Sequence, residues 1–157
     1  MSDPNVDRWS QLGVVYLWKN KHPRMHEWAI MADDRACDSI LDLLARMENA
    51  QWPSKRTLFV AKPTRPPDHG GDYKYRGATE WTIVYRKGTV SNDHWLLEER
   101  GQGILLSVGL SRLRELRDAM IDMKRGGGDY SIGDDETPLW IWWYIQQPTP
   151  TEVPRRA

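Results

Sequence analysis

The sequence predicts an α+β fold, with a mainly antiparallel sheet of about five to seven strands and two helices packed on one face. Three observations support this fold class. Seven segments have the β-branched, aromatic or alternating composition of strands, two segments carry apolar residues at helical spacing, and most neighbouring strand segments are separated by short turns. Each predicted helix lies between two predicted strands, which suggests a split β-α-β arrangement extended by a hairpin.

The first half of the chain predicts two strands, a helix and a third strand. Residues 13–18 and 26–32 are the first two strands, and Asp33 or Asp34 can then cap a helix N-terminus. Residues 56–62 form the third strand. The helix runs to about residue 50, because apolar residues at steps of three and four place one stripe on a single face: Cys37, Ile40, Leu41, Leu44 and Met47.

The second half predicts three strands, a helix and a last strand. The strands are 72–87, 94–100 and 103–109, and the last two flank a short hairpin turn. A helix over about 112–125 follows and ends at three consecutive glycines, which permit the left-handed conformation that stops a helix. Residues 139–145 form the last strand.

Length and end composition predict one domain over residues 9–145. A chain of 157 residues is near the usual size of a single domain, and it contains no convincing linker. Residues 1–8 are polar and residues 146–157 hold three prolines, so both ends are predicted to be flexible tails.

Charge and cysteine content exclude several classes of protein. The 22 basic and 22 acidic residues cancel, so no broad basic field suggests nucleic acid as a partner. No apolar run is long enough to span a membrane, and the N-terminus lacks the pattern of a signal peptide. One cysteine, Cys37, excludes an internal disulfide framework. We therefore expect a cytoplasmic protein with neither nucleic acid nor membrane as its partner.

The last predicted strand is the most informative segment for function. Leu139, Ile141, Trp143 and Ile145 are expected on one face, and three aromatic residues on the other: Trp140, Trp142 and Tyr144. This second apolar face could bind a small ligand or a partner, or it could be buried inside the monomer. Alternation within 72–87 places further aromatic residues on one side, which could lie nearby: Tyr73, Tyr75 and Trp81.

Carboxylates near these rings suggest a site for a cation, because the face of an aromatic ring is electron-rich. Asp129, Asp134, Asp135 and Glu136 precede the aromatic strand, and another group lies on candidate neighbouring strands: Glu80, Glu98 and Glu99. The alternative is that the acidic run is a solvated turn. Arg117, at the flank of the second helix, either extends to water or reaches an anion.

No residue set meets the requirements of a known metal, cofactor or nucleophile site. The glycines of 126–128 follow a helix, whereas a phosphate loop precedes one. His26 begins a segment like the zinc-binding HExxH helix, but Ile30 stands where the second ligand is required. Cys37 lies on the apolar stripe of the first helix and is expected to be structural. The sequence predicts neither a metal nor a cofactor.

Three functions remain open. The first is a non-catalytic small binding protein that uses the aromatic face for a small amphipathic or cationic ligand; its candidate residues include Arg117. The second is an interaction module, either a homodimer or a partner-binding protein of the inhibitor or immunity kind. The third is an enzyme that uses acid–base groups near His69, Asp72 and His94. We expect binding rather than catalysis.

Overall fold

The computed structural model describes residues 3–20, 27–67 and 75–147 of the chain. Its helices are α1 (Pro4–Asp7), α2 (Asp34–Asn49) and α3 (Leu110–Lys124). Its strands are β1 (Val15–Asn20), β2 (Trp28–Ala32), β3 (Ser54–Ala61), β4 (Tyr75–Gly77), β5 (Glu80–Tyr85), β6 (Trp95–Arg100), β7 (Gly103–Val108), β8 (Tyr130–Ile132) and β9 (Leu139–Ile141).

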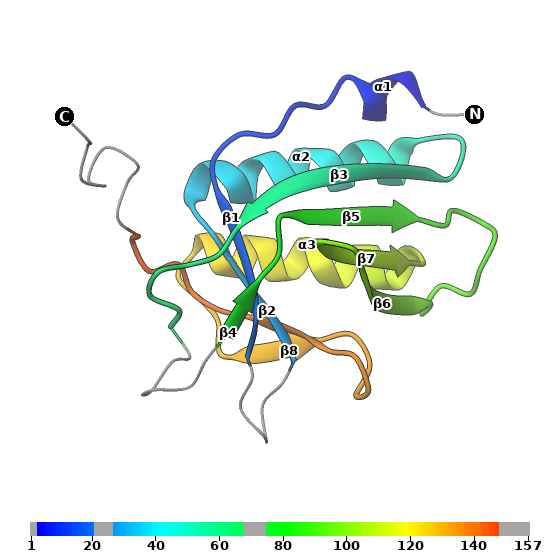
Figure 1. Ribbon diagram of the computed structural model, residues 1–157. Coiled ribbons are helices and arrows are strands. Elements are labelled where there is room, and N and C mark those ends of the chain that lie inside the picture. Colours follow the sequence, from blue (N-terminus) through cyan, green and yellow to red (C-terminus); the bar gives the residue numbers. More distant parts are fainter. Residues whose placement is uncertain (1–2, 21–26, 68–74, 148–157) are drawn as a thin grey trace.

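The strands form one mixed sheet that curls into a half-barrel (Figure 1). The order is β6-β7-β5-β3-β1-β2-β9-β8, and β4 pairs with the end of β1. Three pairings are parallel: β1 with β3, β2 with β9, and β5 with β7. The predicted mainly antiparallel sheet of five to seven strands with two helices is therefore wrong, although the protein is α+β.

The predicted topology is wrong because three strands pair in parallel with strands that come earlier in the chain. The hairpin of β1 and β2 leads into α2, which returns the chain so that β3 lies parallel to β1 on its free side. In the second half, β7 enters between β6 and β5. The predicted hairpins of β1 with β2 and of β6 with β7 do form, but β5 and β6, although joined by a turn, do not pair. Turn length does not reveal that a later strand pairs in parallel with an earlier one.

Two predicted strands also have different bounds from those expected. The segment 72–87 contains two strands with different neighbours, because β4 pairs with β1 and β5 pairs with β3. Gly77, at the end of β4, lies so close to Lys62 that a side chain there would collide with it. In the last segment, only Leu139–Ile141 is a strand, and β8 was not predicted. The alternation therefore fails after Trp142: Trp143 is exposed instead of joining Leu139 and Ile141 in the core.

The main hydrophobic core lies between the sheet and the two long helices, which cover the same face (Figure 1). Asp33 caps α2, since its carboxylate accepts the Ala36 amide at 2.8 Å. The apolar stripe of α2, including Ile40, Leu44 and Met47, is buried in this core. None of the helices in the described ranges is long and apolar enough to cross a membrane.

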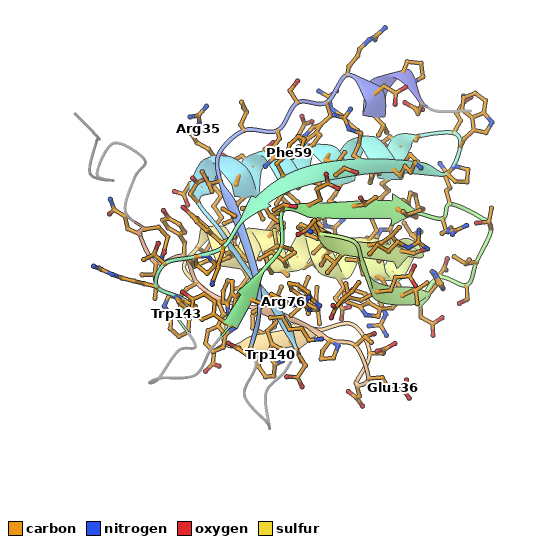
Figure 2. All side chains as sticks on the ribbon, in the orientation of Figure 1. Arg35, Phe59, Arg76, Glu136, Trp140 and Trp143 are labelled. Carbon is orange, nitrogen blue, oxygen red and sulfur yellow. The ribbon has the colours of Figure 1, made fainter. Side chains whose placement is uncertain are left out.

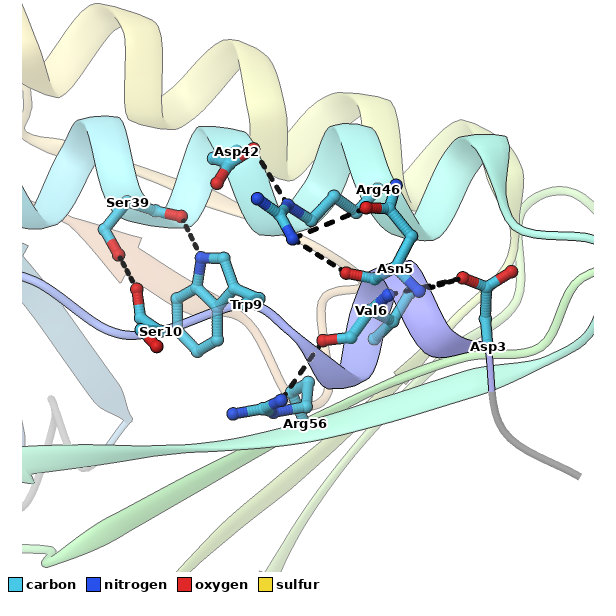
Figure 3. Close-up of polar contacts among 9 residues, drawn as sticks. All are labelled: Asp3, Asn5, Val6, Trp9, Ser10, Ser39, Asp42, Arg46 and Arg56. Atoms are coloured by element: carbon cyan, nitrogen blue, oxygen red, sulfur yellow. Dashed lines mark hydrogen bonds and ion pairs between the residues drawn. The ribbon is translucent and has the colours of Figure 1, made fainter.

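The N-terminal segment is attached to α2 and β3 (Figure 3). Arg46 of α2 donates to the Asn5 carbonyl at 2.8 Å, and Arg56 of β3 donates to the Val6 carbonyl at 3.1 Å. The Trp9 indole donates to the Ser39 carbonyl at 2.7 Å. Residues 3–8, expected to belong to a flexible tail, thus contain α1 and a buried Val6. Most of the predicted C-terminal tail, 148–157, lies outside the described residues.

A second hydrophobic cluster lies on the sheet face that the helices do not cover. This aromatic cluster consists of buried Trp18, Ala29, Met31 and Trp142, with Tyr16, Tyr75, Trp140, Tyr144 and Ile145 packed against them. The central strands β1, β2 and β9 are thus apolar on both faces, which is typical of strands that are covered on both sides.

Candidate functional site

An acidic cleft opens at the mouth of the half-barrel, where the edge strand β6 faces the start of β2 and the loop between β8 and β9. It has a volume of about 390 Å³. We call it the mouth cleft, and it is lined by Lys19, Glu27, Trp28, Leu97, Glu98, Glu99, Asp135, Glu136, Thr137 and Pro138. Such a volume lies within the range that small-molecule sites occupy.

Strand register builds one wall of the mouth cleft. Trp28 of β2 pairs with Lys19 of β1, and Lys19 pairs with Arg76 of β4. Residues directly opposite one another on neighbouring strands present their side chains on the same face. The Arg76 guanidinium consequently stands over the Trp28 ring, 5.4 Å from its centroid.

Glu99 connects the two walls. One of its carboxylate oxygens accepts from the Lys19 ammonium at 2.6 Å, and the other accepts from the Arg76 guanidinium at 2.6 Å. These two hydrogen bonds lower the pKa of Glu99 to about 2, so this carboxylate stays ionised at any ordinary pH. The carboxylate thereby fixes β6 to β1 and β4 across the open side of the sheet.

The loop between β8 and β9 forms the opposite wall, and its backbone is held in place. Asp134 accepts from the Thr137 amide at 2.8 Å and from its hydroxyl at 3.0 Å, which closes a turn. The Thr137 carbonyl accepts from the Trp95 indole at 2.7 Å. Gly133, with φ of +90°, packs directly against the Trp95 ring. Asp135 and Glu136 are both exposed in this loop, and Figure 2 shows Glu136 pointing away from the sheet.

The charge in the mouth cleft is only partly compensated. Glu99 has two cationic partners, and Glu98 is 2.5 Å from the Arg100 guanidinium. Glu27, Asp135 and Glu136 form no ion pair with any residue that the structure describes. Within the described part of the chain, their carboxylates therefore place negative charge without a cationic partner beside the apolar side chains of Trp28, Leu97 and Pro138.

The carboxylates are spread along the cleft. Among the described residues, no three His, Cys, Asp or Glu side chains are arranged to hold a metal ion. A divalent metal needs several oxygen ligands around one point, whereas separated carboxylates beside an indole suit an extended organic cation.

A larger cavity, of about 580 Å³, lies between α3 and β8, and its charged side chains are paired. Arg114 is 3.0 Å from Glu48, and this contact lowers the pKa of the Glu48 carboxyl. Glu115 is 3.0 Å from Arg112 and Asp118 is 3.1 Å from Arg117. Because these neighbours neutralise one another, the cavity presents little free charge to a ligand.

The predicted aromatic face is mostly covered by the chain itself. Trp140, Trp142, Tyr144 and Tyr75 do come together in the aromatic cluster, as Trp140 and Trp142 stack with their ring centroids 6.3 Å apart. Trp142 is only 7% exposed. Its indole N–H and that of Trp140 are buried and have no acceptor among the described residues.

Two chain segments are tied together beside the aromatic cluster. The Gln147 side chain accepts from the Thr64 and Arg65 amides at 2.7 and 2.8 Å. The Tyr75 hydroxyl donates to the Pro63 carbonyl at 2.8 Å. The segment 63–65 is thereby fixed to both the C-terminal segment and β4.

The remaining predicted site residues are dispersed. Trp81 is fully buried in the main core, on the opposite face from the aromatic cluster, and Arg117 is paired with Asp118 on α3. Tyr73 lies outside the described residues.

Of the three residues predicted for an enzyme, the structure describes only His94. The His94 ring contacts the Ser107 hydroxyl through Nε2 at 3.0 Å, a proximity that the sequence analysis did not predict. Ser107 is fully buried, so its hydroxyl is not accessible to a substrate. His69 and Asp72 lie outside the described residues.

Seven carboxylates were predicted as a possible site for a cation, and four of them line the mouth cleft: Glu98, Glu99, Asp135 and Glu136. The other three do not line it: Glu80, Asp129 and Asp134. Trp28 was not predicted, because the aromatic residues of the sequence are densest in the segment 139–145. Lys19 and Arg76 were not predicted either, because their approach to Glu99 depends on the curvature of the sheet. Comparison with protein-family models and with curated proteins finds no match, so function must be argued from this geometry.

Proposed function

We propose that the protein is a non-catalytic binding protein that holds a small amphipathic cation in the mouth cleft. The observation that carries the proposal is the convergence of five carboxylates from three chain segments on one cleft: Glu27, Glu98, Glu99, Asp135 and Glu136. Only Lys19 among the lining residues is cationic.

The chemistry of the walls indicates the class of ligand. An ammonium group gains both Coulomb attraction and hydrogen bonds from the carboxylates of Asp135 and Glu136, which have no cationic partner among residues 3–20, 27–67 and 75–147. An apolar or aryl body can then contact Trp28, Leu97 and Pro138, which provide the nonpolar part of the lining. We therefore expect an arylalkyl ammonium compound rather than an inorganic cation.

The test is calorimetric titration with 2-phenylethylammonium and with its neutral counterpart, 2-phenylethanol. We expect binding of the cation and at least tenfold weaker binding of the alcohol. The double variant Asp135→Asn/Glu136→Gln should weaken cation binding by about fivefold, since each partly screened carboxylate contributes less than about 1 kcal/mol. Asp129→Asn is the control for the loss of a negative charge elsewhere, because it removes one exposed carboxylate that precedes β8 and lies outside the cleft.

Equal binding of the alcohol, or equal loss of affinity in the Asp129→Asn control, would contradict the proposal. The proposal includes a cytoplasmic location, which the low cysteine content supports.

The other two functions stay predictions. A homodimer or partner-binding module is supported by exposed apolar side chains, of which Phe59 at 71% is the most exposed. Light scattering over a range of concentrations tests self-association directly. A mass that stays at that of the monomer would contradict the prediction of a homodimer. For an enzyme, His94 is the one predicted acid–base residue that lies within the described part of the chain.

A further inference from the structure

Arg76 does not itself line the mouth cleft, but it contacts two residues that do, Trp28 and Glu99. Its guanidinium is 5.4 Å from the ring centroid and bonds to Glu99 at 2.6 Å. Trp28 is itself only 6% exposed, whereas the Arg76 side chain is 46% exposed. The indole thus already has a cation beside it, and that cation comes from the chain.

Lys19 provides a close comparison. It lies beside Arg76 in the sheet and contacts the same carboxylate at the same distance, 2.6 Å. Each residue places one positive charge beside Glu99. Of the two, only Arg76 stands over an aromatic ring, and only Lys19 lines the mouth cleft itself.

We infer that Arg76 determines the specificity of the mouth cleft, because its guanidinium fills the indole face that a quaternary ammonium ligand would require. This inference rests on the proposed function and narrows its ligand class to primary ammonium compounds. A primary ammonium carries three hydrogen-bond donors and can bind the carboxylates of Asp135 and Glu136 without using the ring face. A quaternary ammonium carries no donor and depends on contact with aromatic faces.

The comparison of Arg76→Gln with Lys19→Gln separates the ring from the charge. Each substitution removes one of the two positive charges beside Glu99 and leaves the other in place. Loss of charge alone strengthens the binding of every cation to a similar extent. Loss of Arg76 also uncovers the Trp28 face, so it should strengthen quaternary ammonium binding in particular.

The probes are 2-phenylethylammonium and its N,N,N-trimethyl derivative, measured by calorimetry on each variant. In the unmodified protein, the primary compound should bind more tightly. Arg76→Gln should shift the affinity ratio toward the trimethyl compound by about fivefold or more, the size expected of a partly desolvated cation–π contact. Lys19→Gln should leave that ratio unchanged within about twofold, and Arg76→Lys, which keeps the charge, should give an intermediate ratio.

An equal ratio in the Arg76→Gln and Lys19→Gln variants would overturn the inference. So would tight binding of the trimethyl compound to the unmodified protein. In both cases the proposed function would stand, because the cleft would still bind cations. Failure of the unmodified protein to bind either compound would overturn the inference and the proposed function together.

Discussion

The Glu99 carboxylate lies 2.6 Å from the Lys19 ammonium, although three strands, β7, β5 and β3, separate their strands in the sheet. This contact is possible because the sheet curls until its first strand faces its centre. The same carboxylate holds Arg76, so a single side chain connects β6 with both β1 and β4. The sheet does not close into a barrel, and the mouth cleft is the space that is left between β6, the start of β2 and the loop between β8 and β9.

Glu99→Gln should lower the free energy of unfolding by about 1 kcal/mol. The side chain is 40% exposed, so solvent screens both of its ion pairs and the loss stays below that of a buried pair. Urea denaturation measures the change. Asp42→Asn, which removes an exposed pair with Arg46 within α2, serves as the control and should cost about 0.5 kcal/mol or less. A smaller loss for Glu99→Gln than for this control would contradict the connecting role of Glu99.

The stabilisation by Glu99 should depend on pH. The two cations lower the pKa of this carboxyl from 4.5 to about 2, so the folded protein binds the proton more weakly than the unfolded chain. The contribution is therefore complete above about pH 4.5 and is lost as the pH falls toward 2. The difference in unfolding free energy between the unmodified protein and Glu99→Gln should shrink over this interval. A difference that stays constant down to pH 2 would rule out the ionic origin.

Gly133→Ala should destabilise the loop that forms one wall of the mouth cleft. Gly133 has φ of +90°, and a methyl group there would collide with the Trp95 ring, so we expect a loss of about 3 kcal/mol. Gly88→Ala is the control, because φ is +70° and nothing lies within 4 Å of the added carbon. That variant should lose only about 1 kcal/mol, from backbone strain. Equal losses in thermal denaturation would show that the Trp95 contact has no energetic consequence.

Trp95→Phe and Trp142→Phe should differ in cost even though they remove the same atoms. The two residues are equally buried, at 8% and 7% exposure, but only Trp95 donates its indole proton, to the Thr137 carbonyl. The Trp142 indole has no acceptor among the residues described, so its replacement removes no hydrogen bond. Trp95→Phe should therefore cost about 1 kcal/mol more in chemical denaturation. A larger loss for Trp142→Phe would show that its indole proton has a partner in solution.

Local patterns in the sequence predicted local structure well. The helical stripe of Ile40, Leu44 and Met47 and the glycines after Lys124 located α2 and the end of α3. The sheet order could not be predicted, because the parallel pairings of β1 with β3 and of β5 with β7 join strands that other elements separate along the chain. Hydrophobic alternation gives the face of each residue within a strand but not the neighbour of that strand.

The candidate site was predictable in its chemistry but not in its position. The sequence indicated Glu99 and Asp135 as carboxylates of a site beside an aromatic ring, and both line one cleft. That the ring is Trp28 rather than Trp140 follows from the curvature of the sheet, which brings β6 to the start of β2. No spacing of residues in the sequence predicts that β6 and the start of β2 lie close together.

The most direct test is an NMR titration of the tryptophan indole N–H signals with 2-phenylethylammonium. The account predicts that the signal of Trp28 shifts with saturation while those of Trp140 and Trp142 stay constant, because only Trp28 lines the mouth cleft. Saturable shifts at Trp140 and Trp142 with none at Trp28 would place the ligand on the aromatic cluster and contradict the account.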